Sequence, residues 1–550
     1  MRSLLNRRSA AWFFGICFIT NTSAYAGPLP ERVENAARDR IAAGIHQTLV
    51  FGVVDGDRSE VVAFGTLDDG KAPDGDTVYE IGSVSKTFTA TLLAQAVLAG
   101  RVTLDTPVAQ LLPDFQIPSR GGAQITLGQL ATQHSGLPRE ASNLLPKDIR
   151  NPYADYDVAK LKAFLAEYEL PRDPGAGYEY SNLGFGLLGA ALAQSERMMW
   201  GALAGDRILN PLGMMLSGTA LSDAMRAHLA PGHDATGNAV ENWDFDALAG
   251  AGAMRSTAND MLRYLKANMG VDPSPLTEAM KLAQAPHSDV NTNSRIGLAW
   301  TTNRSGITWH NGETGGYHSF IGFAADRRHG VVILSNTAAD LDDLGFTTLN
   351  SRAGLSPPIK AIVLPAAALD EVVGTYKFAD NFLLKVFRID NRLFVQGSRQ
   401  GAIPIFASAP GEFFARFVHA SVSITRDATG AVNGLVLHQN GDRPARKLAA
   451  SEIKPEPKEI AFDAAASGDY AGKYQFDFGV LDVVLKSDHL EAKLSGQAAF
   501  PIFASSKDRF FYKIVDAQLD FERDGSGKVV AVVLHQGGRD MRASRISTQR

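Results

Sequence analysis

The sequence predicts an α+β fold: an antiparallel sheet flanked by helices, with an inserted helical subdomain, followed by two repeated small antiparallel β-barrels. Three observations predict it. A helix and two strands come before a long, mostly helical region, and further strands follow that region. Pro357, Pro358 and Pro365 then mark a linker. Beyond the linker, short alternating segments repeat at a nearly constant offset, which is the signature of duplicated units.

The first domain is expected to span 27–355. Helical spacing of apolar residues covers Pro30 to Ala43, and a turn at 55–58 joins two strands as a hairpin. Strands are expected at 49–54, 61–64, 77–81, 295–302, 306–310, 317–324 and 330–335, and helices near 86–97, 127–134, 157–168, 183–196, 201–210 and 257–268. Because strands lie at both ends of the domain, we expect one sheet built from both ends.

The C-terminal part carries an internal repeat. Val373–Phe378 recurs as Ala471–Phe476 after 98 residues, and two further landmarks recur after 97 residues: Ile405–Ser408 as Ile502–Ser505, and Leu435–Gln439 as Val532–Gln536. Closure removes the exposed edges of such short strands, so we expect two barrels of about eight strands each. The expected ranges are linker 356–368, barrel 369–450, linker 451–465 and barrel 466–550. His438 and His535 recur with the repeat, and we interpret them as strand residues rather than ligands.

The first 26 residues predict a signal peptide. A basic start is followed by the apolar run 10–19 and by the small-x-small exit Ala24-Tyr25-Ala26. The alternative is a retained membrane anchor, but the apolar run is short for a membrane span. Cleavage would remove the only cysteine and three arginines, so the formal charge would fall by three, from −5 to −8. An exported chain without cysteine indicates a bacterial periplasm.

Composition excludes several classes of function. The mild negative charge and the lack of basic runs give no reason to expect a nucleic-acid partner. No segment after the first 26 residues is long and apolar enough to span a membrane. The chain has no G-x-S-x-G elbow and no H-E-x-x-H zinc motif, and we expect neither a cofactor nor a metal. The oligomeric state is left open.

Ser83 and Lys86 form the strongest candidate for chemistry. Ser83 follows a short extended segment and the breaker Gly82, at the point where a helix begins, and Lys86 lies on the same helix face. A serine hydroxyl becomes a nucleophile when a base takes its proton, and a lysine can be that base when burial lowers its pKa. The alternative is a helix cap with a solvated lysine. A second Ser-x-x-Lys sequence, Ser451 to Lys454, lies beside prolines and is not followed by a helical pattern, so we interpret it as part of a linker.

Two further clusters support this interpretation. Tyr180 and Asn182 lie on a Gly-rich loop that feeds a helix, where a phenol can shuttle a proton and an amide can anchor the lysine or a substrate carbonyl. The alternative is a helix cap with a packed tyrosine. His310, Gly312 and Glu313 lie at the end of one predicted strand and before the next. The G-x-G-x-x-G string at 184–189 has no strand before it, so we reject dinucleotide binding and expect close helix packing.

The order Ser83-x-x-Lys86, Tyr180-x-Asn182 and His310-x-Gly312 resembles the penicillin-recognising serine hydrolases related to class C β-lactamases. That group includes DD-peptidases of the AmpH kind, D-aminopeptidases and esterases. The likeness covers about 40–345 and includes the segments ITLGQLATQHSGLPRE, PGAGYEYSNLGFGLLG and HNGETGGYHSFIGF. The repeated tail is similar in plan to the two barrels of D-aminopeptidases.

The resemblance implies a role for each motif residue. Ser83 would be acylated, Lys86 would be its base, and Tyr180 would give a proton to the leaving group and activate water. Asn182 would contact a substrate amide, and His310 and Gly312 would line the substrate site. The backbone N–H groups of Ser83 and Glu313 would form the oxyanion hole.

The sequence departs from the family at two places. Many relatives have Lys-Thr-Gly where this chain has His310-Asn311-Gly312, and a neutral histidine binds a substrate carboxylate less well than lysine does. Gln133 and His134 also stand where many relatives have His and Thr, and the sequence offers no functional account of that exchange.

The expected function is therefore that of a periplasmic serine hydrolase acting on peptides with D-amino acids. The first hypothesis is a D-alanyl-D-alanine carboxypeptidase or endopeptidase of peptidoglycan peptides, with weak β-lactam hydrolysis. A D-aminopeptidase or an esterase is the alternative, because His310 and the tail favour it. The alternative from another class is a non-catalytic protein that binds cell-wall fragments or lipid.

Overall fold

The structure is a computed structural model. It describes residues 29–144, 146–355, 359–379, 382–397, 402–415, 420–439, 441–453, 460, 467–486, 489–495, 499–512, 517–536 and 539–546. The predicted signal peptide and the lysine of the second Ser-x-x-Lys string lie outside these residues. Within them, no helix combines the length and the apolar composition that a membrane crossing requires.

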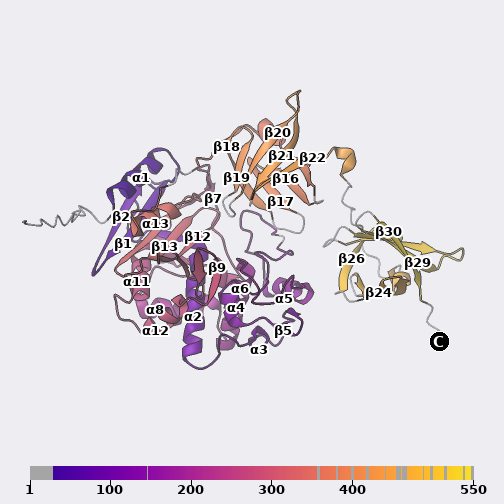
Figure 1. Cartoon of the computed structure of the whole chain (residues 1–550), viewed down its shortest axis with the longest axis horizontal. Helices are drawn as coiled ribbons and strands as arrows, with labels where there is room; N and C mark the ends of the chain where they lie inside the picture. The colour runs from indigo at the N-terminus through magenta and orange to yellow at the C-terminus, as the bar shows by residue number, and fades with distance from the viewer. Residues whose placement is uncertain are drawn as a thin grey trace, which may run out of the picture.

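An eight-stranded antiparallel sheet forms the centre of the first domain (Figure 1), in the order β2-β1-β14-β13-β12-β11-β10-β9. Its strands are β1 (Thr48–Asp55), β2 (Arg58–Gly65), β9 (Ser288–Asn291), β10 (Ser294–Ile296), β11 (Thr301–Asn303), β12 (Thr308–Glu313), β13 (His318–Phe323) and β14 (His329–Ser335). Strand β1 pairs with β14, so Val50 lies opposite Leu334. The prediction of one sheet built from both ends of the domain is confirmed.

One predicted strand is wrong. The sequence suggested a single strand over 295–302, whereas the chain forms two strands, β10 and β11, that pair with each other. Ala299 between them has a φ of 66°, a left-handed conformation that ends an extended segment. Trp300 is fully buried at this turn. Burial of a large ring therefore outweighs the local preference for a continuous strand.

Both faces of the sheet are covered by helices. Phe51 and Ile333 pack with α1 (Glu31–Ala42) and α13 (Asp342–Leu349) on one face. Val50 and Leu334 belong to the large cluster on the other face, which includes α2 (Ser85–Leu98), α11 (Ala258–Met269) and α12 (Thr277–Gln284). Successive side chains of a strand point to opposite faces, so a sheet covered on both sides has continuous apolar strands.

The region between β2 and β9 supplies the subdomain that was expected to be helical. Its short elements are β3 (Val78–Glu80), the 3₁₀ turn η1 (Gly82–Val84), α3 (Val108–Leu111), β4 (Ser119–Arg120), β5 (Ala123–Gln124), α4 (Leu127–Ala131), α5 (Val158–Glu167), α6 (Asn182–Glu196), α7 (Trp200–Ala204), the π turn η2 (Gly205–Leu209), α8 (Asn210–Leu212), α9 (Asp223–Ala227), β6 (Gly232–His233), β7 (Ala239–Val240), α10 (Ala249–Gly252) and β8 (Arg255–Thr257).

Two closed eight-stranded barrels follow, drawn in orange and yellow in Figure 1. The first follows α14 (Ala366–Asp370) and contains β15 (Gly374–Phe378), β16 (Leu383–Ile389), β17 (Arg392–Gly397), β18 (Ile403–Ala409), β19 (Glu412–Ala415), β20 (Ser421–Arg426), β21 (Val432–His438) and β22 (Asp442–Lys447). After the 3₁₀ turns η3 (Ala450–Glu452) and η4 (Gly468–Tyr470), the second contains β23 (Gly472–Phe476), β24 (Gly479–Leu485), β25 (Leu490–Leu494), β26 (Ala499–Ser506), β27 (Arg509–Phe511), β28 (Ala517–Arg523), β29 (Val529–Gln536) and β30 (Arg539–Arg545). The predicted pair of barrels is confirmed.

The first barrel contacts the first domain. Arg392 at the start of β17 forms an ion pair with Asp234, whose side chain is buried. Phe406 and Phe414 of the barrel pack against Ala235. An ion pair beside an apolar contact fixes how the two surfaces lie against each other. Residues of the barrel form one wall of a large cavity at this junction.

The G-x-G-x-x-G string lies in α6 and serves helix packing. A Cβ at Gly186 would lie 2.9 Å from the Cα of Leu248, and one at Gly189 would lie 2.9 Å from the Cα of Gly250. Two backbones that approach so closely leave no space for a side chain. The glycines therefore let α6 lie directly against α10.

We predict that Gly189→Ala lowers the free energy of unfolding of the first domain by about 1–3 kcal/mol, because the added methyl group must push α10 away. Scanning calorimetry of the full chain measures this as a lower midpoint of the domain's transition. Gly205→Ala is the matched control: its Cβ meets nothing within 4 Å, so this variant should be neutral or slightly stabilised. Equal midpoints for the two variants would contradict the packing role.

Candidate active site

Lys86 and Ser83 are in direct contact at the start of α2. Ser83 lies in η1, one turn before the lysine, and Lys86 Nζ donates a hydrogen bond to Ser83 Oγ at 3.0 Å. The same amine donates to Asn182 Oδ1 at 2.7 Å and to the carbonyl of Ala251 at 2.8 Å. The lysine side chain is fully buried. Three elements, α2, α6 and α10, therefore converge on one amine.

The environment of Lys86 favours its neutral form. Burial lowers the pKa of Lys86, and the positive charge of Arg139 lowers it further, against the opposite effects of Tyr180 and Glu140. A neutral amine keeps two N–H donors and gains a lone pair. Asn182 and Ala251 can take the two hydrogens, which leaves the lone pair for the hydroxyl proton of Ser83. The arrangement can therefore deprotonate the serine.

Tyr180 lies beside this pair. Lys86 Nζ is 4.9 Å from the centre of the Tyr180 ring on the loop before α6. Burial alone would raise the pKa of Tyr180, but the positive charges of Lys86 and Arg139, with hydrogen bonds to Ser83 and Lys86, lower it below its usual range. A phenol whose anion is stabilised in this way can give up a proton and take it back.

The strand β12 packs its backbone against the serine turn. A Cβ at Gly312 would lie 2.0 Å from the Ile81 carbonyl oxygen and 2.9 Å from the Ser83 nitrogen. Gly82 has a φ of +47°, and a Cβ there would lie 2.7 Å from the Glu313 nitrogen. Any side chain at either glycine would separate the two segments. The glycines thus place the backbone nitrogens of Ser83 and Glu313 on adjoining backbone segments, as an oxyanion hole requires.

His310 lies on β12 and is uncharged at neutral pH. Its side chain is buried, and Nδ1 lies 2.6 Å from the Asn311 carbonyl oxygen. Burial lowers the pKa of His310 to about 3, and the charge of Lys86 contributes to the shift. The position at which many relatives have a lysine therefore carries no positive charge here.

The sequence did not reveal two partners of the site, Ala251 and Glu140. Ala251 acts through its backbone carbonyl, which leaves no trace in residue type. Glu140 Oε1 accepts hydrogen bonds from Asn182 Nδ2 and from the Tyr153 hydroxyl, the latter at 2.8 Å. Glu140 thus orients the amide of Asn182 so that its oxygen faces Lys86. One of the two amide hydrogens that could have served a substrate is used in this way.

The structure explains the unusual Gln133. Its side-chain oxygen accepts the backbone N–H of Ser181 at 2.7 Å, and its carbonyl accepts the N–H of Glu179 at 2.8 Å. Both bonds hold the loop that carries Tyr180. His134 lies behind this loop, with its ring against Tyr178. The two residues shape the loop rather than contact Ser83.

These groups open into a cavity of about 1980 Å³. Its lining includes Ser83, Tyr180, Asn182, His310 and Glu313 from the first domain, together with part of the first barrel. The space is far larger than one amino acid requires. An extended substrate can therefore lie between the serine and the barrel.

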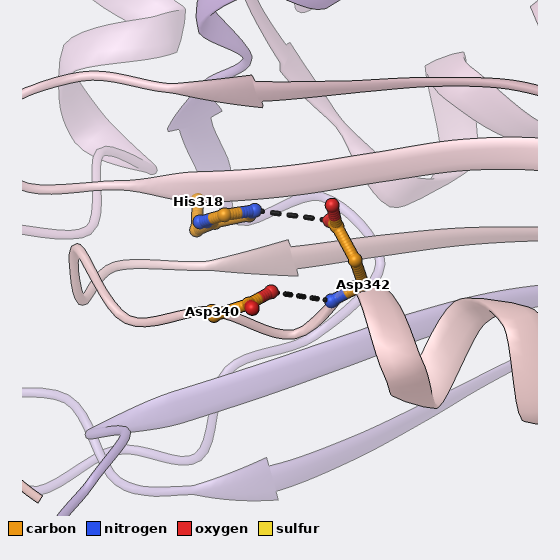
Figure 2. Close-up of side chains that lie close together, drawn as sticks. All are labelled: His318, Asp340 and Asp342. Carbon is orange, nitrogen blue, oxygen red and sulfur yellow. Dashed lines mark hydrogen bonds and ion pairs between the residues drawn. The ribbon is translucent and has the colours of Figure 1, made fainter. Parts of the chain in front are cut away.

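A largely buried ion pair lies beside β12. Figure 2 shows His318 of β13 and Asp342 at the start of α13 facing each other, with Nε2 3.1 Å from Oδ1. Asp342 Oδ2 also accepts from Asn311 on β12 at 2.6 Å, and the Asp340 carboxylate accepts the backbone N–H of Asp342 at 2.9 Å. The ligand-type atoms of His318, Asp340 and Asp342 lie within 4.8 Å of one another. Because protein groups already occupy Asp342, we interpret the cluster as an ion pair that positions β12.

The site and the fold together define a class of protein. A buried amine on a serine hydroxyl, a phenol of lowered pKa and two adjoining backbone nitrogens are the parts of an acyl-transferring serine hydrolase. The comparison with known families agrees. The Beta-lactamase family model matches residues 33–352, more than half of the chain, and the chain belongs to this family of serine hydrolases. A family described as a domain of unknown function, DUF3471, matches residues 456–546.

Relatives and solved structures show what this chain is similar to. It is 27% identical to Penicillin-binding protein 4 of Amycolatopsis lactamdurans, over 59% of this chain and 91% of that one. It is 25% identical to D-alanyl-D-alanine-carboxypeptidase/endopeptidase AmpH of Escherichia coli, over 60% of this chain and 91% of that one. The structure of D-alanine carboxypeptidase AmpC from Burkholderia cenocepacia matches with a TM-score of 0.50 and 24% identity, over 58% of this chain and 99% of that one, which shows the shared fold.

We predict that Lys86→Ala slows acylation of Ser83 by about three orders of magnitude, because the hydroxyl loses its proton acceptor. The measurement is the rate of mass increase on Ser83 with a fluorophosphonate probe. Lys71→Ala, at an exposed lysine, is the control and should react as the unmodified chain does. A loss of tenfold or less in the Lys86 variant would remove the lysine from the role of base.

The His318–Asp342 pair predicts a loss of stability at alkaline pH. Burial alone would lower the pKa of His318, but the hydrogen bond and charge of Asp342, with Glu313 and Asp340 nearby, raise it to about 9. A histidine is ordinarily half-protonated near pH 6.5, so the pair's stabilisation is complete below about pH 6.5 and disappears as the pH rises through 9. Asp342→Asn should remove on the order of 1 kcal/mol of this pH dependence.

Thermal unfolding between pH 6.5 and 9.5 measures this effect. Asp326→Asn is the matched control, since it removes the carboxylate beside His329, a histidine that is half exposed. The control should keep the alkaline loss of stability. If Asp342→Asn keeps the same loss, the pair does not titrate as described.

Proposed function

We propose that the chain is an exported, periplasmic hydrolase that forms an acyl-enzyme on peptides containing D-amino acids. The reaction that the site supports best is that of a D-alanyl-D-alanine carboxypeptidase or endopeptidase of peptidoglycan peptides. The observation that carries the proposal is the contact of Lys86 Nζ with Ser83 Oγ in a buried site whose other acceptors, Asn182 and Ala251, do not titrate. The names of the relatives Penicillin-binding protein 4 and D-alanyl-D-alanine-carboxypeptidase/endopeptidase AmpH support the substrate class.

The proposed reaction has two halves. Ser83 Oγ attacks the carbonyl carbon while its proton passes to Lys86, and the backbone N–H groups of Ser83 and Glu313 stabilise the oxyanion. Tyr180 then gives its proton to the leaving nitrogen, the C–N bond breaks and an ester remains on Ser83. In the second half, water gives a proton to the Tyr180 phenolate and attacks the ester carbonyl. Lys86 returns its proton to Ser83 Oγ as the C–O bond breaks, which releases the acid and restores the serine.

One observation favours a second candidate. Because His310 is uncharged at neutral pH, β12 offers no cation that could bind the C-terminal carboxylate of a substrate. A D-aminopeptidase or an esterase needs no cation at position 310. Weak β-lactam hydrolysis fits the same acyl chemistry, and the missing charge limits it.

We expect the chain from Gly27 onward to gain the mass of one penicilloyl group on Ser83 when it is incubated with labelled penicillin, or of one phosphonyl group when it is incubated with a fluorophosphonate. Intact-mass and peptide mass spectrometry measure the adduct, and Ser83→Ala should show none. Peptides ending in D-alanyl-D-alanine as the free acid should then be cleaved faster than their amides.

The other outcomes distinguish the alternatives. A strict need for a free N-terminus would identify a D-aminopeptidase, and equal cleavage of acid, amide and simple esters would identify an esterase. If no acyl donor labels Ser83 in the folded chain, the hydrolase proposal fails and a non-catalytic protein that binds cell-wall fragments or lipid is favoured.

A further inference from the structure

Arg139 places a fixed guanidinium beside the catalytic tyrosine. It lies in the loop after α4, and its backbone carbonyl accepts the N–H groups of Asn182 and Leu183 at 2.9 and 3.3 Å. These bonds lock the loop to the start of α6. The guanidinium Cζ lies 4.9 Å from the centre of the Tyr180 ring. A planar cation that stacks on a ring keeps its orientation with little loss of entropy on binding.

The guanidinium has no acceptor within the described part of the chain. Arg139 makes no side-chain hydrogen bond and no ion pair there, although it lines the same cavity as Ser83. The carboxylate next in sequence, Glu140, is turned away toward Asn182 and Tyr153. Five N–H donors in a fork that matches a carboxylate are thus available to a ligand in the cavity.

Other cations of the cavity lining are already occupied. Each of three arginines is paired with an aspartate: Arg40 with Asp343, Arg150 with Asp148, and Arg392 with Asp234. His318 is paired with Asp342. Arg443 belongs to β22 of the first barrel, where it lies over the rings of Phe378 and Phe382. His310 on β12 is uncharged. Among the described residues that line the cavity near Ser83, Arg139 is therefore the cation that offers a charge to a substrate.

We propose that Arg139 binds a carboxylate of the substrate on the leaving-nitrogen side of the bond that breaks. The side follows from Tyr180: its hydroxyl reaches Ser83 and serves the leaving nitrogen, and Arg139 lies against its ring. An anion held by Arg139 belongs to the fragment that departs. This inference rests on the proposed function. It assigns the enzyme's specificity for substrates with a free carboxylate to Arg139 on the loop and not to a residue of β12.

The test compares benzylpenicillin with its methyl ester, which differ only in a carboxylate on the nitrogen side of the reacting amide. The rate of acylation of Ser83 is measured by intact mass for the full chain, Arg139→Gln, Arg139→Lys and Arg150→Gln. We expect the unmodified chain to prefer the acid by about tenfold or more. Arg139→Gln should bring the acid-to-ester ratio close to one, Arg139→Lys should keep part of it, and Arg150→Gln should leave the ratio unchanged.

The ratio separates binding of the carboxylate from other effects of the substitution. A change in folding, or in the ionisation of Tyr180, slows both probes alike and does not move the ratio. An unchanged ratio in Arg139→Gln overturns the inference, and so does an unmodified chain that reacts equally with both probes, or with neither while a neutral fluorophosphonate labels Ser83. Absence of any adduct on Ser83, by contrast, overturns the proposed function itself.

Discussion

The site depends on keeping one amine dry and fully hydrogen-bonded. Burying an amine among apolar groups is costly unless polar groups replace its water, and here three oxygens lie within hydrogen-bond distance of Lys86 Nζ. Two of these oxygens, on Asn182 and Ala251, cannot accept a whole proton at any relevant pH. The serine hydroxyl is the third, and it is the only one of the three with a hydrogen to give. The proton that Lys86 accepts therefore comes from the Ser83 hydroxyl.

Close backbone packing is the structural cost of this arrangement. The Ala251 carbonyl reaches Lys86 because α10 lies directly against α6, at the contact of Gly189 with Gly250. The same solution recurs where Gly312 of β12 meets the serine turn. Glycine loses more backbone entropy on folding than other residues, so the domain needs its large core to offset these positions. A site built on helix and strand backbones is more rigid than one built on loops alone.

The sequence predicted the parts of the site that act through distinctive side chains. Ser83, Lys86 and Tyr180 could be predicted because each is a reactive group at the start of a helix. Their partners could not be predicted. A backbone carbonyl such as that of Ala251 carries no residue signal, and Glu140 in an irregular loop looks like a solvated acid. For the fold, the repeat predicted both barrels, whereas the break of the strand near Trp300 depended on tertiary burial.

Separating the two positive charges has a physical advantage. A lysine at position 310 would bring a second amine into the buried region that holds Lys86, where burial already disfavours a charged amine. A positive charge on Lys86 lowers the pKa of His310, so a charge at one of these positions disfavours a charge at the other. Arg139 lies half-buried on the loop, beside the ring of Tyr180. The ring of Tyr180 lies 4.9 Å from Lys86 Nζ and 4.9 Å from Arg139 Cζ, so the charge of either group acts on the pKa of this phenol.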